Sequence, residues 1–406
     1  MQHVSNHILV ACLAFLAACQ TAPRPNAGTL VIAGGAVRDE GPIMPRFFAE
    51  ATAAAERAAK ANPTVEIVPT ASGDPAASLQ RNQEFFLAMA THLTAQGLLL
   101  DSAVPDGAQN AGNAQRLREA SAVWFAGGDQ SRITEFFRPG LLESGDDELA
   151  STSTPCDQAL RHMLAKGGVI GGSSAGAAIM SQQMIAGGRS ESALTHGASP
   201  EGLRIRPGMD LFPYGLVDQH FLARGRLGRL LVAMQHTGER FGFGIEENSA
   251  LIVRLGDEPM CEALGVQAVC ILDRGSSNAA HEDGVWTAEL SMLGSGDRWD
   301  PINAQCKPAA DRIQWPASKR TPPRDPAPLE AWEKGAIQSA LLRLCQQPGE
   351  PQVLDSPGHR LILSSGPQTR YMVRAHRGID LFADRVLLRI ERKQTETQGA
   401  IRSLGD

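Results

Sequence analysis

Residues 167–185 read GGVIGGSSAGAAIMSQQMI, and this stretch decides the fold. Within it, Gly172, Ser174 and Gly176 fit the G-x-S-x-G pattern of a nucleophile elbow, a tight turn that exposes a serine between a strand and a helix. The apolar run before the serine predicts the strand, and the alanine-rich segment after it predicts the helix. On local sequence alone, a Gly/Ser turn that only begins a helix explains the pattern equally well.

Around this turn, short apolar runs alternate with helical patterns, which predicts a parallel sheet covered by helices. Two of the apolar runs, SAVWFAGGDQ and GGVIGG, end in glycines, as expected where a strand turns sharply at the carboxyl edge of a sheet. Open α/β sheets bind their ligands at that edge. The runs before the turn are TLVIAGG (29–35), PRFFAEATAAAERAAKA (45–61, helical), TVEIVPTASGDP (64–75) and NQEFFLAMATHLTAQG (82–97, helical).

Beyond residue 250 the pattern changes to strand-like runs separated by turns. The Pro-rich stretch 315–328 predicts a linker, and 329–346 predicts one amphipathic helix, followed by a few antiparallel strands. We therefore divide the chain into a leader (1–19), a short linker (20–28), a main domain (29–301), a Pro-rich linker (302–328) and a small C-terminal α+β extension (329–406).

Composition excludes several classes of protein. The 406 residues are 43% hydrophobic and 20% charged, which is enough for one large domain or two modest ones with real cores. The net charge of -6 makes nucleic acid an unsuitable partner, because phosphate backbones require clustered basic surface. No CxxC or HExxH pattern is present, so we expect neither a metal nor a cofactor.

The first residues predict export. The apolar run ILVACLAFLAA (8–18) is too short to span a bilayer and is followed by Cys19 in a tetrad, LAAC, that resembles a bacterial lipobox. We expect a periplasmic or cell-surface lipoprotein whose lipid on Cys19 anchors it to the membrane. The segment before the run lacks Lys and Arg, so an ordinary secretory signal cleaved nearby is the alternative.

Cysteine use is compatible with an oxidising compartment. Beyond the leader an odd set of five cysteines permits at most two disulfides. One bridge would join Cys261 to Cys270 across a short loop, and another would join Cys306 to Cys345. Buried free thiols are the alternative.

A serine hydroxyl needs a base and an acid to become a nucleophile at neutral pH. The best-placed base is His220 in LVDQHFLARGRLGRL, just after a short apolar run, and the acid candidate is Glu247 at the end of the Gly-rich run FGFGI. The order Ser, His, Glu differs from that of α/β-hydrolases. Taken alone, His220 is more often a structural histidine than a catalytic one.

Four ordered segments resemble the cyanophycinase and aspartyl-dipeptidase family of serine peptidases, peptidase family S51. The likeness extends over residues 29–301, and its motifs are WFAGGDQSRI (124–133), GGSSAGAA (171–178), VDQHFLARGRLGRL (217–230) and GFGIEENSALIV (242–253). The resemblance implies a doubly wound, mostly parallel sheet similar to that of class I glutamine amidotransferases. It places the catalytic residues at Ser174, His220 and Glu247.

Two mild departures from the family pattern are Ser173, where threonine is common, and Glu246, where aspartate is common. Neither removes a catalytic group. Elbow geometry makes the Ala175 amide one oxyanion donor, and the resemblance implies the Gly128 amide as the second.

The segment after His220 is rich in arginine, whose guanidinium groups suit carboxylates. The alternative for each arginine is a solvated helix face with nearby acids. The resemblance implies a pocket for a polyaspartate backbone that carries arginine side chains. Its lining is expected to include Gln130, Asp218, Gln219, Arg224, Arg226 and Arg229.

The expected function is therefore that of an exported serine exopeptidase that hydrolyses cyanophycin from one end to β-Asp-Arg dipeptides. Other β- or α-aspartyl peptides are alternative substrates. An esterase or amidase with the same elbow, or a non-catalytic binding lipoprotein of the same fold, are alternative functions. Similar family members suggest a homodimer.

Overall fold

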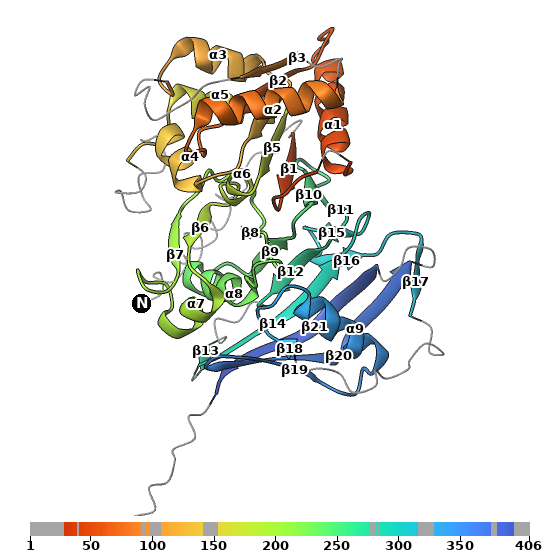
Figure 1. Ribbon diagram of the computed structural model, residues 1–406. Helices are drawn as coiled ribbons and strands as arrows, with labels where there is room; N and C mark the ends of the chain where they lie inside the picture. The colour runs from red at the N-terminus through yellow and green to blue at the C-terminus, as the bar shows by residue number, and fades with distance from the viewer. Residues whose placement is uncertain are drawn as a thin grey trace, which may run out of the picture.

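The computed structural model describes residues 28–38, 40–90, 94–97, 107–140, 153–275, 281–282, 284–315, 329–374 and 380–393. In these residues two large sheets, each with its own helices, lie one above the other in the view of Figure 1. The chain passes between the two sheets several times, so both contribute to the region where they meet.

Among the described residues the first sheet has nine strands, and its central part is parallel. The parallel strands lie in the order β3 (Thr94–Gly97), β2 (Thr64–Val68), β4 (Ala122–Phe125), β5 (Val169–Ser173) and β1 (Thr29–Ala33). Beyond β1 the sheet continues with antiparallel strands β10 (Ser249–Arg254), β11 (Met260–Gly265), β15 (Arg298–Asp300) and β16 (Gln305–Lys307). The predicted α/β class with a largely parallel central sheet is confirmed.

Helices cover both faces of this sheet, and strand β1 shows why. Its alternate residues Val31 and Ala33 lie in one core cluster, while Leu30 and Ile32 lie in the other, because successive strand residues point to opposite faces. The first cluster contains α1 (Ile43–Arg57) and α2 (Pro75–Met89). The second contains α3 (Ala111–Glu119), α4 (Gln130–Phe137) and α5 (Pro155–Ala165).

The second sheet is mostly antiparallel and joins strands from distant parts of the chain. Its order is β18 (Leu329–Glu330), β19 (Gln352–Ser356), β20 (His359–Arg374), β21 (Leu381–Arg392), β14 (Val285–Leu293), β12 (Val269–Asp273), β9 (Phe241–Ile245) and β8 (Leu216–Gln219). Strand β13 (His281–Glu282) pairs with β14, and β17 (Arg312–Gln314) pairs with β20. Its core includes side chains of α7 (Ser190–His196), α8 (Leu227–Thr237) and α9 (Ala336–Gln346).

The C-terminal extension is part of this second sheet. Its antiparallel strands β19, β20 and β21 form as predicted, and β21 pairs with β14 of the preceding region. The predicted linker contains two short strands, β16 and β17, before residue 315, and residues 316–328 lie outside the described residues. The strands that precede the catalytic histidine and glutamate candidates, β8 and β9, therefore share a sheet with the C-terminal extension.

Two predicted helices have different bounds in the structure. The helix expected over 329–346 begins only at Ala336, because residues 329–330 pair with β19 and Gly335 adopts a left-handed conformation with φ of 84°. The helix expected over 82–97 begins earlier, at Pro75, where the Asp74 side chain accepts a hydrogen bond from the Ala77 amide as an N-cap. Residues 94–97 form β3 instead.

The predicted disulfides are wrong. The five cysteines described are buried, and none of them forms a disulfide with another: Cys156, Cys261, Cys270, Cys306 and Cys345. Cys261 lies in β11 of the first sheet and Cys270 in β12 of the second, so neighbouring positions in sequence are separated by the change of sheet. Burial raises the pKa of the Cys156 thiol to about 11, which keeps it protonated and unreactive.

Among the described residues, no helix combines the length and the apolar character required to cross a membrane. The predicted leader, including Cys19, lies outside the described residues.

Candidate active site

Ser174 lies on the predicted elbow at the carboxyl edge of the first sheet. Strand β5 ends at Ser173, helix α6 (Ala175–Ala178) follows, and Ser174 between them has φ of 57° and ψ of -108°, a strained conformation for a residue with a side chain. Both flanking positions require glycine, because a side chain at either of them would collide with a backbone carbonyl oxygen. A Cβ on Gly172 would lie 2.4 Å from the Gly176 carbonyl oxygen, and one on Gly176 would lie 2.4 Å from the Phe125 carbonyl oxygen.

The helix after the elbow is shorter than the sequence predicts. It ends at Ala178, and strand β6 (Gln183–Gly187) follows and pairs with β7 (Arg204–Pro207). Tertiary pairing of 183–187 with 204–207 therefore overrides the helical propensity of the alanine-rich segment.

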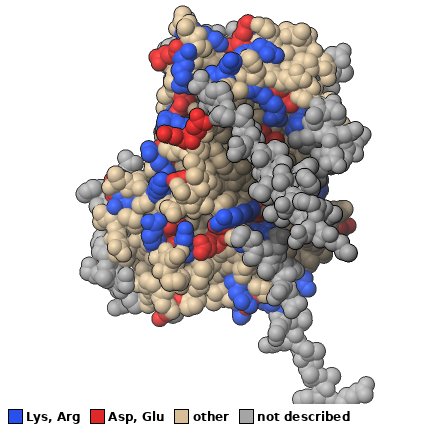
Figure 2. Space-filling view, turned by 180° about the vertical axis from the view of Figure 1, so that it is seen from behind, with Lys and Arg blue, Asp and Glu red and all other residues tan. Residues whose placement is uncertain are grey.

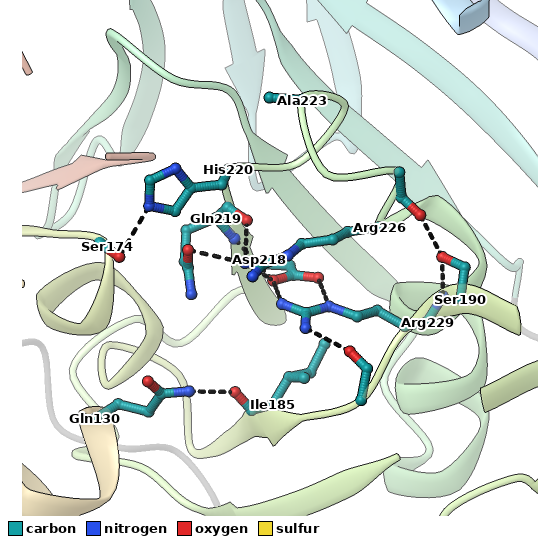
Figure 3. A network of polar contacts seen from close by, with 12 residues as sticks. Gln130, Ser174, Ile185, Ser190, Asp218, Gln219, His220, Ala223, Arg226 and Arg229 are labelled. Carbon is teal, nitrogen blue, oxygen red and sulfur yellow. Dashed lines mark hydrogen bonds and ion pairs between the residues drawn. The ribbon is translucent and has the colours of Figure 1, made fainter. Parts of the chain in front are cut away.

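The structure brings Ser174, His220 and Glu247 together in one hydrogen-bonded chain. His220 Nε2 lies 3.0 Å from Ser174 Oγ, and His220 Nδ1 lies 2.8 Å from Glu247 Oε1. Ser174 comes from the first sheet, whereas His220 and Glu247 follow β8 and β9 of the second. Figure 3 shows the imidazole directed at the serine hydroxyl. This is the arrangement of a nucleophile, a base and an acid that orients the base.

The turn after β1 connects these pieces, and the sequence reasoning did not single it out. The Gly34 carbonyl oxygen accepts a hydrogen bond from the His220 amide at 2.7 Å, and the Gly35 carbonyl oxygen accepts one from the Asn248 amide at 2.8 Å. Gly35 has φ of +115°, and a Cβ there would lie 2.2 Å from Cε1 of the His220 ring. The turn therefore holds the loops of His220 and Glu247 through backbone hydrogen bonds. The close approach of residue 35 to the His220 ring requires glycine.

Burial lowers the pKa of His220, and the nearby guanidinium groups of Arg224 and Arg226 lower it further, while the hydrogen bond that the ring donates to Glu247 opposes them. The pKa of Glu247 is lowered mainly by its hydrogen bond to His220, with smaller contributions from Lys334 and Arg224. His220 is therefore neutral and Glu247 ionised at neutral pH, which is the protonation state required of a base and its orienting acid.

A second carboxylate, Glu246, supports the loop after His220. Its oxygens accept hydrogen bonds from the Leu222 amide at 2.5 Å and the Ala223 amide at 3.0 Å. Burial raises the pKa of Glu246, while these amide hydrogen bonds oppose the shift. Sequence reasoning noted this residue only as a departure from the family pattern, yet it fixes the backbone that positions the base.

Of the two predicted oxyanion donors, Ala175 directly follows Ser174, and Gly128 follows Gly127, which lies close to Ser174. Ala175 is the first residue of α6, so its amide has no acceptor within the helix. Gly127 and Gly128 follow β4, and a Cβ on Gly127 would lie 3.4 Å from Cβ of Ser174. Gly128 has φ of +149°, and a Cβ there would lie 2.0 Å from the Ala71 carbonyl oxygen, so this position requires glycine.

Of the predicted substrate residues, Asp218 and Arg229 form a buried ion pair with each other. Arg229 Nε and Nη2 donate to the two Asp218 carboxylate oxygens at 2.7 and 2.5 Å, and the side chains are 5% and 1% exposed. Arg229 Nη1 also donates to the Gly188 carbonyl oxygen at 2.8 Å. Figure 3 shows the paired groups to the lower right of His220. This pair supports the pocket wall from within.

Gln219, Arg226 and Gln130 are also engaged within the protein. Arg226 Nη1 donates to the main-chain and side-chain oxygens of Gln219 at 2.6 and 2.9 Å, and burial lowers its pKa to about 10. Gln130 Nε2 donates to the Ile185 carbonyl oxygen at 2.7 Å. Arg224, in contrast, is exposed, and its amide donates to the His220 carbonyl oxygen at 3.1 Å. Arg224 is therefore the member of the predicted set that is placed to meet a ligand near the triad.

A cleft of about 830 Å³ adjoins the loop that carries Arg224. On the face seen in Figure 2, a hollow separates the upper and lower parts of the molecule, with basic and acidic side chains around it. The cleft is also lined by Trp332, which lies in the turn before α9 and within the helix predicted over 329–346. Its charged lining residues are Arg189, Arg204, Arg224, Arg226, Arg229, Glu191 and Glu201.

Within the part of the chain that the structure describes, no group of three or more His, Cys, Asp or Glu side chains is arranged to hold a metal ion.

Comparison with known proteins gives consistent results. The family model described as "Peptidase family S51" matches residues 30–258, which include Ser174, His220 and Glu247. The chain is 33% identical over 196 residues to the cyanophycinase of Geminocystis herdmanii, covering 45% of this chain and 64% of that protein. It is 28% identical over 306 residues to the cyanophycinase of Trichormus variabilis, covering 72% of this chain and 92% of that protein.

A solved structure of a peptidase from an acI-B1 Actinobacterium is also similar, with a TM-score of 0.48 and 15% sequence identity over 68% of this chain and 97% of that one.

Proposed function

The chain belongs to peptidase family S51 and is a serine-type peptidase, and on this basis we propose that it hydrolyses cyanophycin to β-Asp-Arg dipeptides. Cyanophycin is a polyaspartate whose side-chain carboxyls carry arginine. Both relatives named above are cyanophycinases, which favours this polymer over other peptides as the substrate.

The observation that supports the proposal most strongly is the Ser174–His220–Glu247 chain beside a cleft rich in guanidinium groups. Both hydrogen bonds are formed, at 3.0 and 2.8 Å, so the nucleophile is already paired with its base. The cleft contains five arginines and two glutamates, a balance that favours a substrate bearing several carboxylates.

In the proposed reaction, His220 Nε2 takes the proton of the Ser174 hydroxyl as its oxygen attacks the scissile carbonyl carbon. The tetrahedral intermediate collapses to an acyl-enzyme when the C–N bond breaks, and the His220 imidazolium gives its proton to the leaving amine. Water then attacks the acyl-enzyme, with His220 again as base, and releases the carboxylate product and free Ser174. Glu247 stabilises the imidazolium in both halves and keeps the ring in the required orientation.

The oxyanion of each tetrahedral intermediate would accept hydrogen bonds from the Ala175 and Gly128 amides. Donors fixed by an elbow and by a glycine turn do not have to reorganise during the reaction, which is the main source of such stabilisation. Removing one such donor typically costs about 100- to 1,000-fold in kcat.

Binding of the substrate carboxylates is assigned chiefly to Arg224, because its side chain is exposed next to the triad. Arg226 and Arg229 also line the cleft, but their hydrogen bonds to Gln219 and Asp218 direct part of each guanidinium into the protein. We expect Arg226 and Arg229 to stabilise the part of the cleft wall on which Arg224 is exposed.

The test is release of β-Asp-Arg from purified cyanophycin by the purified full chain, measured by chromatography. The Ser174→Ala variant should release none, and the matched variant Ser173→Ala, one residue away, should retain activity. Absence of release by the unmodified, folded protein would refute cyanophycin as the substrate, and hydrolysis of other β- or α-aspartyl peptides would then be measured on the same preparation.

We also propose that the protein acts outside the cytoplasm and carries lipid on Cys19, because residues 8–18 form a short apolar run followed directly by that cysteine. Radiolabelled fatty acid should be incorporated by the full chain and not by Cys19→Ser. A secreted, unlabelled product from the unmodified chain would contradict the lipid anchor and favour ordinary signal cleavage.

A further inference from the structure

The turn 331–335 brings the C-terminal extension to the cleft beside the loop that carries Arg224. It lies beyond residues 30–258, which the family model matches, yet Trp332 lines the cleft together with Arg224 and Arg226. Lys334 of the same turn lowers the pKa of Glu247, which places its charge near the triad. Part of the cleft wall is therefore made by a region outside the matched peptidase segment.

This turn is held firmly in place. The two residues before it, in β18, pair with Leu354 and Asp355 of β19, and the Ala331 amide donates to the Asp355 carbonyl oxygen at 2.7 Å. The Ala336 amide donates to the Glu333 carbonyl oxygen at 3.2 Å, which closes the turn onto α9. A wall anchored by a sheet on one side and a helix on the other is suited to selecting a ligand.

Trp332 packs directly on the arginine-rich loop after His220. Gly225 has φ of +58°, and a Cβ there would lie 2.3 Å from the Trp332 carbonyl oxygen. The far end of the indole contacts α8, since a Cβ on Gly228 would lie 3.1 Å from Trp332 Cη2. The indole N–H has no acceptor among the described residues, so packing is what positions the half-buried ring.

The charge of the cleft raises a specific problem for the proposed substrate. Each repeating unit carries a guanidinium as well as a carboxylate, and a wall with five arginines repels the guanidinium. Among the described lining residues, the groups that suit a flat cation are the indole of Trp332 and the exposed carboxylates of Glu191 and Glu201. An aromatic face attracts a guanidinium that lies within about 6 Å of its centroid.

We propose that Trp332 is a specificity-determining residue whose indole face receives the guanidinium of a substrate arginine, on a wall supplied by the C-terminal extension. The inference rests on the proposed function, because it says where the guanidinium binds, which is the second charged group in the repeating unit of the proposed substrate. Arg224 binds the carboxylate of the unit, and Trp332 selects its cationic end.

The test measures binding by titration calorimetry in the full chain carrying Ser174→Ala, with two dipeptides. One is β-aspartyl-arginine, and the other is β-aspartyl-citrulline, which has nearly the same shape but no charge. In this background, Trp332→Leu removes the aromatic face and Trp332→Phe keeps one. Arg224→Gln serves as the matched control, because it should weaken both dipeptides about equally.

The preference for arginine over citrulline should fall by about three- to thirty-fold in Trp332→Leu and be largely kept in Trp332→Phe and Arg224→Gln. An unchanged preference in a folded Trp332→Leu protein, checked by circular dichroism, overturns the inference. So does failure of both dipeptides to bind to the Ser174→Ala protein. Failure of the unmodified chain to degrade cyanophycin, with the preference still dependent on Trp332, would refute the proposed function and leave the guanidinium site standing.

Discussion

Substitution of Gly35 by alanine should disable the catalytic base while leaving the fold intact. The added Cβ would lie 2.2 Å from Cε1 and 2.4 Å from Nε2 of the His220 ring, so the ring would have to move by about 1 Å to reach an ordinary contact distance. The hydrogen bonds of the ring to Ser174 and Glu247, at 3.0 and 2.8 Å, cannot both survive such a shift.

The backbone at this turn has little freedom to move instead. The Gly34 carbonyl oxygen is bonded to the His220 amide at 2.7 Å, and the Gly35 carbonyl oxygen to the Asn248 amide at 2.8 Å. A displacement of about 1 Å in a catalytic group costs on the order of 100-fold in rate. We therefore expect kcat of Gly35→Ala to fall by at least about 100-fold.

The matched control is Gly238→Ala, at the end of α8. Gly238 also has a positive φ, +75°, but nothing lies within 4 Å of an added Cβ. Both variants should lose roughly 1–3 kcal/mol of folding free energy through backbone strain, measured by urea unfolding. Only Gly35→Ala should lose kcat in the peptide-release assay. A Gly35→Ala protein with kcat within threefold of the unmodified chain would refute the role assigned to this turn.

Three further predictions concern the charged groups around the triad. Arg229→Leu removes the closer cation of buried Asp218 and leaves it with Arg226, whose Nη1 lies 3.6 Å away, so it should cost about 3 kcal/mol in urea unfolding. Arg224→Gln should change the free energy of unfolding by less than about 0.5 kcal/mol, and equal losses in the two variants would contradict the structural role assigned to Arg229. Arg224 lowers the pKa of His220, so Arg224→Gln should raise that pKa and move the acid limb of the kcat/KM profile to higher pH, because the neutral ring is the active form. A small neutral ester as substrate separates this effect from peptide binding, and an acid limb that stays in place or moves to lower pH would be inconsistent with it. Glu246→Gln replaces an acceptor of two backbone amides by a group with one fewer acceptor oxygen, and it should cost about 1–3 kcal/mol in unfolding free energy together with a lower kcat; full kcat with lost stability would show that the loop does not position His220.

Much of the first sheet could be predicted from the sequence because its signals are local. The elbow at Ser174 needs small residues at fixed spacing, and the apolar runs that end in glycine mark strands at the carboxyl edge of the sheet. The short apolar run before His220 and the Gly-rich run before Glu247 form strands β8 and β9. Local signals could not predict that those strands belong to a second sheet, since strand pairing depends on residues far apart in the chain.

The predictions that failed share one cause. A disulfide between Cys261 and Cys270 is plausible by spacing, yet the chain changes sheet between them. A helix starting at 329 is plausible by periodicity, yet β19 takes residues 329–330 as a strand partner and Gly335 delays the helix. In each case a tertiary partner, invisible to local pattern, decided the outcome.

The sequence by itself determined the class of chemistry, because four ordered motifs resemble one serine peptidase family and include Ser174, His220 and Glu247, although His220 taken alone is more often structural. The tertiary structure alone decided how those residues are held and which others share the site. Gly35 touches the His220 ring, Asp218 neutralises Arg229, and Trp332 reaches the cleft from the C-terminal extension. These contacts join segments separated by 11 to more than 100 residues. Packing and charge pairing over such separations depend on how the two sheets meet, and no local pattern carries that information.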